Sequence, residues 1–203
     1  MATIPSSDAP CSSKGRKRCP ETHQAILTAA AELLGEKGYS GVCIEAIAAR
    51  AGVGKQTIYR WWPSKAAVIL EAYANLTELT SPLPDRGSVQ QDLTEFLNSL
   101  LTVLTTTPAG RVMPGLIAEA QNDPQVAASF QELFIANRRT ATQTLLQRGI
   151  DRGELRPTLN LELAIDTLYG PIWYRLLLNH APLSPAFIQE LVEQLLGGMR
   201  VDG

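Results

Sequence analysis

Hydrophobic residues recur at helical spacing from about residue 21 onward. Ile26, Ala30 and Leu33 share one face of a helix that begins near Glu21, and Gly38 is a C-terminal stop signal for it. The pattern contains no β-alternating run of useful length and no repeat of fixed period. The sequence therefore predicts an all-α fold with about nine helices.

Shorter segments follow this first helix. A short helix is predicted at about 44–51, which Gly52 interrupts, and another at about 55–61, which Pro63 prevents from continuing. Ser64 is a suitable N-cap for a fourth helix, which ends near residue 79. After a loop rich in Pro and Gly, further helices are expected at about 89–106, 110–121, 125–150, 160–180 and 185–199.

Composition excludes several classes of protein. A hydrophobic fraction of 45% in 203 residues is too high for a disordered chain. The first 20 residues are polar, and no apolar run is long enough to span a membrane, so we expect a soluble, cytoplasmic protein. The three cysteines are too few and too clustered for a disulfide framework, and they lack metal-ligand spacing. Reduced thiols, no metal and no cofactor are expected.

Charge is divided unevenly along the chain. Residues 1–70 carry a net charge of +4, whereas the remainder carries −6. This asymmetry suggests that the first part meets a polyanion. A basic, solubilising tail would explain residues 14–18 but not Lys55, Arg60 and Lys65, which fall in a segment predicted to fold. We therefore expect a flexible basic arm at 1–19, a folded basic domain at 20–66 that meets the polyanion, and a second helical domain at 67–203.

Residues 42–62 have the pattern of two short helices joined by a tight turn. Ala48 supplies the small residue where the helices cross, and Gly52 tolerates positive φ at the turn. Ile47, Val53 and Ile58 are placed to hold the second helix down. This spacing is that of a helix-turn-helix.

The exposed face of the second helix carries hydrogen-bonding side chains and no acidic residue from that helix. Lys, Arg and Gln side chains suit the donors and acceptors of the DNA major groove, while Tyr and Thr hydroxyls suit phosphates. The alternative is an ordinary helical hairpin with a solvated polar face. The residues of this face are Lys55, Gln56, Thr57, Tyr59 and Arg60.

The N-terminal region resembles the DNA-binding domain of TetR-family transcriptional regulators. The resemblance covers about 50 residues in the family's order and spacing, and the rest of the chain resembles the family's variable ligand-binding and dimerisation domain. It is carried by Ile26–Leu34, Gly38-Tyr39, Ile44-Glu45-Ala46-Ile47-Ala48, Ala51-Gly52-Val53, Thr57-Ile58-Tyr59 and Trp62-Pro63-Ser64-Lys65.

The resemblance implies roles for individual residues. Lys55, Gln56 and Arg60 would face base edges or adjacent phosphates. Thr57, Tyr59 and Lys65 would hold the DNA backbone. The basic arm, which includes Arg16, Lys17 and Arg18, would follow the adjacent minor groove.

Two positions depart from the family's usual pattern. Cys43 stands where Ser or Thr commonly caps the second helix and touches a phosphate. A thiol caps poorly, and Ser40 would be the alternative residue for that phosphate contact. Trp61 stands where His, Arg or Tyr is commoner, and it either stacks against a sugar or covers the helix end.

The C-terminal helices are expected to provide a ligand cavity. Apolar walls suit a largely hydrophobic small molecule, although ordinary core packing explains the same residues. Arg111, Asn137 and Arg175 are either polar contacts inside the cavity or solvent-facing residues. The candidate lining is Met113, Leu116, Ile117, Phe130, Phe134, Trp173 and Tyr174.

The last two helices are the expected dimer interface, because the family pairs them into a four-helix bundle. A dimer that reads two half-sites matches a palindromic operator. The alternative is that these stripes pack only the core of one chain. The interface candidates are Leu168, Ile172, Leu176, Phe187, Leu191 and Leu195.

The resemblance implies a repressor that leaves its operator when a ligand binds. The ligand would shift the helix at 110–121, which would push the fourth helix and change the distance between the two DNA-binding domains of the dimer, called the reading heads below. Two other readings remain. A non-specific architectural DNA-binding protein would bind any sequence alike. An enzyme would need catalytic residues, for which only the pair Glu162 and Asp166 offers a hint, and a solvated helix face explains that pair. We expect no enzymatic activity.

Overall fold

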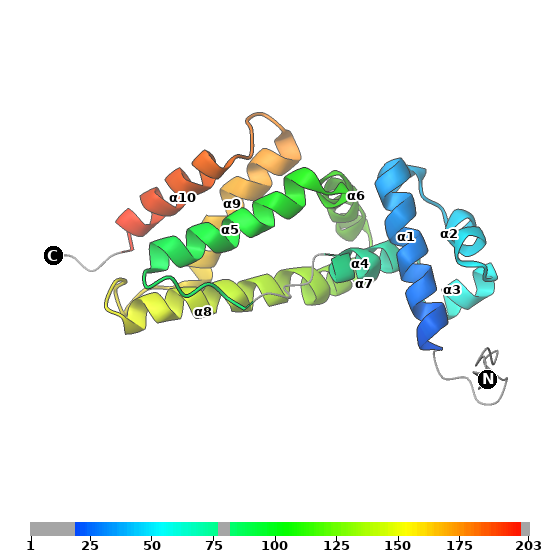
Figure 1. The fold of residues 1–203 in the computed structure, drawn as a ribbon, viewed down its shortest axis with the longest axis horizontal. Coiled ribbons are helices and arrows are strands. Elements are labelled where there is room, and N and C mark those ends of the chain that lie inside the picture. Colours follow the sequence, from blue (N-terminus) through cyan, green and yellow to red (C-terminus); the bar gives the residue numbers. More distant parts are fainter. Residues whose placement is uncertain (1–18, 77–81, 200–203) are drawn as a thin grey trace, which may run out of the picture.

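The computed structural model describes residues 19–76 and 82–199. Within those ranges every element is a helix, which confirms the all-α prediction. Two groups of helices follow one another along the long axis of the molecule (Figure 1). The first group is α1 (Pro20–Gly41), α2 (Ile44–Ala51), α3 (Lys55–Trp61) and α4 (Lys65–Leu76). The second is α5 (Val89–Thr106), α6 (Pro108–Asn122), α7 (Pro124–Phe130), the π-helix η1 (Gln131–Ala136), α8 (Asn137–Asp151), α9 (Leu161–Leu178) and α10 (Pro185–Gly197).

The segment predicted as one helix at 125–150 is one continuous rod with a π turn inside it. Gln131 and Asn137, at the two junctions, both keep right-handed helical backbone angles. Counted as one, α7, η1 and α8 bring the described residues to the nine helices expected. The π turn shifts the hydrogen-bond ladder by one residue, and such turns are frequent at functional sites.

Side-chain caps set the starts of most helices in the second group. Ser88 accepts a hydrogen bond from the Gln91 amide, and Asn160 accepts one from the Leu163 amide. Ser184 does the same for Phe187. Asp123 caps α7, whose first residue is a proline with no amide to satisfy. These are ordinary sequence signals, which explains why the predicted boundaries are close.

The predicted stop of the first helix at Gly38 corresponds to a kink. Gly38 has φ +68° and ψ 177°, which lie outside the helical region, and the helical segment resumes to end at Gly41. Val42 then leads into α2. The positive φ at Gly38 is a conformation that favours glycine.

Two hydrophobic clusters make up the core, and the first one joins both helix groups. Ile26, Ile58 and Tyr73 of the N-terminal group share this cluster with Met113 and Phe134 of the second group. The second cluster lies among α5, α8, α9 and α10. The first cluster therefore packs helix α4 onto the N-terminal group and the C-terminal helices at once.

A buried carboxylate ties the loop before α5 to the loop after α8. Asp92 is fully buried and accepts a hydrogen bond from the Arg86 amide at 2.6 Å. The Arg152 guanidinium reaches its other oxygen at 3.2 Å. Glu154, in the same loop, accepts a bond from the Val89 amide at 2.8 Å. These bonds fix the end of the molecule farthest from α3. No helix within the described ranges is both long and apolar enough to cross a bilayer.

Candidate nucleic-acid interface

The turn between α2 and α3 has the geometry expected of a helix-turn-helix. Gly52 adopts a left-handed conformation with φ +66° and ψ 30°, which allows the chain to reverse between the two helices. The Val53 amide donates to the Ala48 carbonyl oxygen at 3.0 Å and closes the turn. Ile47 and Ile58 are fully buried beneath the two helices. The second helix is thus held with its opposite face outward.

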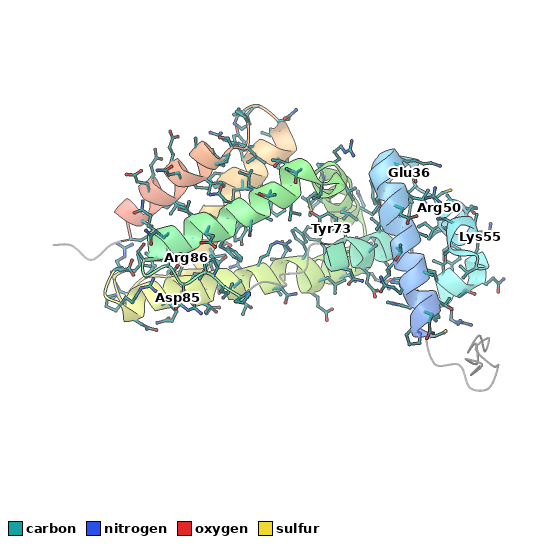
Figure 2. The ribbon with its side chains drawn as sticks, in the orientation of Figure 1. Glu36, Arg50, Lys55, Tyr73, Asp85 and Arg86 are labelled. Atoms are coloured by element: carbon teal, nitrogen blue, oxygen red, sulfur yellow. The ribbon has the colours of Figure 1, made fainter. Side chains whose placement is uncertain are left out.

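That outward face carries the predicted reading residues. Lys55, Gln56 and Arg60 are exposed, and the Tyr59 side chain is 53% exposed. Thr57 is half-buried. Lys55 lies at the end of the molecule opposite Asp85 and Arg86 (Figure 2). The structure therefore gathers a basic and hydrogen-bonding surface on α3, at the extremity of the chain's first helix group.

An acidic residue from α2 joins this surface, which the sequence reasoning missed. Lys55 Nζ donates to Glu45 Oε1 at 3.0 Å. This hydrogen bond lowers the pKa of Glu45 and raises the pKa of Lys55. The sequence signal for this contact is the ten-residue separation of Glu45 and Lys55 across the turn, because the turn places the first turns of α2 and α3 next to each other. In this state Lys55 is partly neutralised before any DNA arrives.

Arg60 and Trp61 lie together at the C-terminal end of α3. The Arg60 guanidinium carbon is 5.4 Å from the centre of the Trp61 ring, within the range of a cation–π contact. The Trp61 ring also lies 5.6 Å from that of Trp62, in an edge-to-face arrangement, and 5.9 Å from that of His23. Half-buried among these rings, Trp61 covers the end of the helix. A contact with a sugar stays a prediction.

The other residues predicted to contact DNA lie outside α3. Lys65 Nζ donates to the Tyr39 carbonyl oxygen at 3.2 Å and lies 4.2 Å from the centre of the Tyr39 ring, so its charge is turned toward α1. Cys43 is exposed at the N-cap of α2 and makes no capping hydrogen bond, as expected for a thiol. The arm residues Arg16, Lys17 and Arg18 lie outside the described residues.

Comparisons with known proteins place the chain in a family. Residues 26–72 match the family described as "Bacterial regulatory proteins, tetR family". Residues 83–195 match the one described as "Tetracyclin repressor-like, C-terminal domain", which is more than half of the chain. The chain belongs to the TetR family. As a member it is a DNA-binding transcriptional regulator and not an enzyme.

Individual TetR-family relatives cover nearly the whole chain. The uncharacterized HTH-type transcriptional regulator YdeS of Bacillus subtilis (strain 168) is 40% identical over 93% of this chain and 95% of its own. The DNA-binding transcriptional repressor TetR of Mycobacteroides abscessus is 28% identical over 85% and 90% of the two chains. The crystal structure of the TetR family transcription regulator SCO0332 has 36% identity and a TM-score of 0.76, covering 88% of this chain and 98% of that one.

The predicted cavity residues of this TetR-family chain fall mostly in one interior cluster. Met113, Leu116 and Phe134 are fully buried, and Phe130 is nearly so. Phe134 is stacked on Phe130 at 5.3 Å and lies 5.4 Å from the ring of Tyr73, which α4 contributes. Ile117 and Trp173 pack against the same cluster from partly buried positions. The interior of the second helix group thus contacts α4 through aromatic rings.

Tyr174 differs from the other predicted cavity residues. Its side chain is 59% exposed, and its ring lies 4.6 Å from that of His180. The residue therefore belongs to the outer face of α9 and not to the interior. Neighbouring positions of a helix are separated by about 100° around the axis, so Trp173 and Tyr174 could not both face inward.

A buried cation beside the aromatic cluster was not singled out from the sequence. Arg138 is 7% exposed, and its guanidinium carbon lies 3.7 Å from the centre of the Phe134 ring. It donates to the Phe134 carbonyl oxygen at 3.1 Å. Burial lowers the pKa of this guanidinium. The available signal was the four-residue spacing from Phe134, which places both side chains on one face of the rod.

The polar residues considered for the cavity lie toward the surface. Arg111 is exposed and donates to the Gly35 carbonyl oxygen of α1 at 3.4 Å. Asn137 is exposed. Arg175 donates to the Pro182 carbonyl oxygen at 2.7 Å and lies over the Phe187 ring. The carboxylates considered as a catalytic pair, Glu162 and Asp166, both bond to one guanidinium, that of Arg139 on α8.

The predicted interface residues divide into two sets. Leu168, Ile172 and Leu191 are buried in the core of the same chain. Leu176, Phe187 and Leu195 are partly buried beside that core. A different set of apolar side chains is exposed along α9, namely Leu163 (62%), Tyr174 (59%), Leu177 (43%) and Leu178 (59%).

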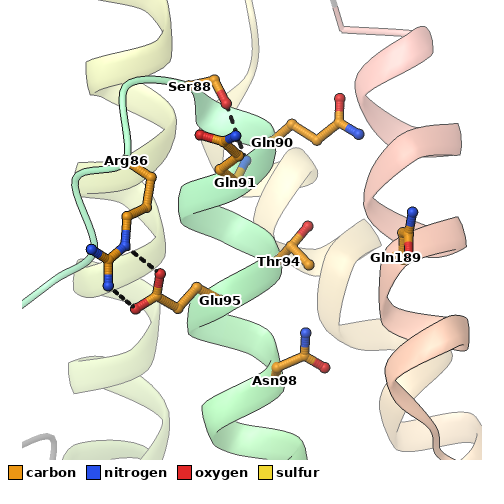
Figure 3. Close-up of a pocket in the computed structure, with 8 residues that line it drawn as sticks. All are labelled: Arg86, Ser88, Gln90, Gln91, Thr94, Glu95, Asn98 and Gln189. Carbon is orange, nitrogen blue, oxygen red and sulfur yellow. Dashed lines mark hydrogen bonds and ion pairs between the residues drawn. The ribbon is translucent and has the colours of Figure 1, made fainter.

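A polar groove between α5 and α10 was not anticipated. It has a volume of about 860 Å³, and every residue that lines it is polar or charged. Arg86 and Glu95 close one side through two hydrogen bonds of 2.7 and 2.9 Å, and Gln189 lies on the opposite side, on α10 (Figure 3). Among the described residues there is no group of three His, Cys, Asp or Glu side chains placed to hold a metal ion.

Proposed function

We propose that this TetR-family regulator is a homodimeric repressor that binds a palindromic operator through α3. The observation that carries the proposal is the exposed face of α3, seated by Gly52 and Ile58. Lys55, Gln56 and Arg60 would read base edges or adjacent phosphates, and Thr57, Tyr59 and Lys65 would hold the backbone. Repression is supported by the printed name of the Mycobacteroides abscessus relative, a transcriptional repressor.

The dimer would form through the exposed apolar stripe of α9. Leu163, Tyr174 and Leu177 recur at spacings of one helical face, and Thr167 and Gly170 lie on that face between them. Small residues at the centre of the stripe allow a partner helix to approach closely. Exposed apolar side chains in such a row mark an interaction surface. A regulator of chromosomal DNA acts in the cytoplasm, which is where we place this one.

The effector would be a small, largely hydrophobic molecule bound among the interior aromatic rings. Met113 and Leu116 of α6, Phe134 of η1 and Tyr73 of α4 share that cluster. A ligand that separates these rings would move α6 relative to α4 and so change the spacing of the two reading heads. A preference of about 3 kcal/mol for the wider spacing would weaken DNA binding by roughly a hundredfold.

DNA selection tests the regulatory function. Fragments of the source genome retained by the purified protein should share one enriched inverted repeat. Uniform recovery of fragments would instead support an architectural protein. Arg60→Ala should abolish retention of that repeat, because it removes a bidentate donor from the reading face. Arg156→Ala, which removes the same charge from an exposed position of the second helix group, is the matched control and should retain it.

The dimer has its own test. Leu177→Glu places a charge in the α9 stripe and should convert the protein from dimer to monomer in sedimentation velocity. Operator affinity should fall as well, because a monomer can contact only one half-site of the operator. Gln143→Glu, at an exposed position of α8, should stay dimeric. A Leu177→Glu protein that sediments as a dimer would contradict the proposed interface.

A further inference from the structure

A second cavity lies where the corner between α3 and α4 meets α7 and the π turn. It has a volume of about 190 Å³ and takes walls from both helix groups. The rings of Phe130, Phe134 and Tyr73 are not among the residues that line it. The cavity-lining residues used below are Trp61, Trp62, Ala67, Val126, Ser129 and Leu133.

The aromatic wall of this cavity is held rigidly. Trp62 is 3% exposed, and its Nε1 donates to Glu71 Oε2 at 2.6 Å. Its ring is stacked on His23 at 4.9 Å with an interplanar angle of 24°. His23 Nε2 lies 2.9 Å from Glu71 Oε1, at ion-pair distance but without hydrogen-bond geometry. Helices α1 and α4 and the end of α3 thus fix the indole in place before any ligand arrives.

The other walls combine aliphatic side chains with the polar side chains of Ser64, Gln125 and Ser129. Val126 and Leu133 come from α7 and η1, and Ala67 comes from the first turn of α4. The Ser64 hydroxyl oxygen already accepts a hydrogen bond from the Ala67 amide at 3.2 Å, and Gln125 is exposed. Ser129, three residues after Val126 on the same face of α7, offers its hydroxyl to a ligand. A cleft with aromatic and aliphatic walls and a small number of polar groups is typical of a site for small organic molecules.

Charge and size narrow the class of ligand. Glu71 brings a carboxylate to the wall, but its two oxygens face Trp62 and His23. The Arg60 guanidinium already lies over the Trp61 ring, where a ligand cation would otherwise bind. Apolar cavities of about 150 Å³ bind benzene, so about 190 Å³ accommodates one ring with a small substituent.

We propose that this cavity is a second small-molecule site, which takes a neutral, planar aromatic molecule with one hydroxyl-type substituent. The ring would stack against the indole walls, and the substituent would bond to Ser129. Because α3, α4 and α7 all line the site, a bound ring would fix α7 against the corner of the reading head. The inference goes beyond the proposed function and does not depend on it, since ligand binding can be measured without DNA.

The experiment uses the full chain and 4-fluorobenzyl alcohol, observed by fluorine NMR. Saturable binding with a Kd of about a millimolar or tighter is expected for a ligand of this size. Ser129→Leu fills the cavity and should weaken binding at least tenfold. Ala128→Leu adds the same side chain at the neighbouring exposed position and should leave binding unchanged. The charged analogues 4-fluorobenzylamine and 4-fluorobenzoate should bind at least tenfold more weakly than the alcohol.

A second variant covers the case in which Ser129→Leu fails to fold. Leu133→Ala enlarges the cavity, so 1-naphthylmethanol, a two-ring alcohol, should gain affinity relative to the one-ring probe. With Trp173→Phe as background, quenching of Trp61 and Trp62 emission reports the same event. The proposal is overturned if no saturable binding occurs, if Ser129→Leu binds as Ala128→Leu does, or if the amine binds best. Loss of binding in Phe134→Leu alone would assign the ligand to the interior cluster and also overturn it.

Discussion

Gly115 of α6 lies directly against the ring of Tyr39 at the end of α1. A Cβ built at Gly115 would be 2.9 Å from two carbons of that ring, closer than side chains normally approach. This contact brings together the helix expected to respond to an effector and the helix group proposed to bind DNA. The absence of a side chain at Gly115 is what allows the approach.

Gly115→Ala should therefore lower the free energy of unfolding by about 1–3 kcal/mol, as expected for overpacking. The measurement is chemical denaturation at one fixed protein concentration. In a Tyr39→Leu background the smaller side chain leaves room, and the penalty of Gly115→Ala should shrink by at least about 1 kcal/mol. Equal penalties in the two backgrounds would show that the ring does not limit the approach of α6.

The environment of Tyr39 also predicts that the free energy of unfolding falls at alkaline pH. Burial, and then the nearby Glu119 carboxylate, raise the pKa of Tyr39 to about 12. An unfolded tyrosine has a pKa of about 10, so the unfolded chain loses this proton first. The stability that Tyr39 contributes is complete below pH 10 and is lost as the pH rises toward 12.

The test compares unfolding free energies at pH 9 and pH 11. Tyr39→Phe should show a smaller fall between these values than the parent protein. Tyr174→Phe, at a 59% exposed position, should fall as much as the parent. If both variants follow the parent, Tyr39 does not account for the loss.

Asp92 should matter more for stability than its exposed neighbour Glu95. Asp92→Ala leaves the Arg86 amide and the Arg152 guanidinium without their buried acceptor, and should cost about 2–4 kcal/mol. Glu95→Gln removes an exposed partner of Arg86 and should cost less than about 1 kcal/mol. Denaturant titration of both variants measures the difference, and equal costs would contradict the importance of burial.

Glu45 should restrain DNA binding through Lys55. Glu45→Gln releases the lysine, so affinity should rise at low salt, and the plot of log K against log salt should steepen by up to about 0.9. Lys55→Ala should weaken binding and flatten the plot by a similar amount. In a Lys55→Ala background, Glu45→Gln should have little effect. An undiminished gain in that background would mean that Glu45 acts on DNA without the lysine.

Local sequence signals were enough to predict the helices, but they did not predict how residues far apart in the sequence pack. Ser88, Asn160 and Ser184 mark helix starts within a few residues of their own positions, so the sequence shows them directly. The π turn has no capping residue or breaker to mark it in the sequence, since the backbone keeps right-handed helical angles at both of its junctions. Periodicity also could not show that Leu168 faces its own core while Leu163 faces outward, since α9 is apolar on several sides.

For the candidate site the same limit applies. The α3 face was predictable because one short helix and one turn define it. Glu45 and Lys65 change that picture through contacts with residues ten and 26 positions away. The first contact depends on how α2 and α3 cross, and the second on how α1 and α4 pack, which spacing within one helix does not determine.

The unbroken rod formed by α7, η1 and α8 has a mechanical consequence. One end of it touches the corner of the reading head, and the other ends at the loop that Arg152 and Glu154 fasten to α5. Both ends of the rod are therefore held by neighbouring parts of the structure. We expect a twist applied at either end to be taken up at the π turn, where Arg138 and Phe134 meet. The helix would then deform at this turn and stay rigid on both sides of it.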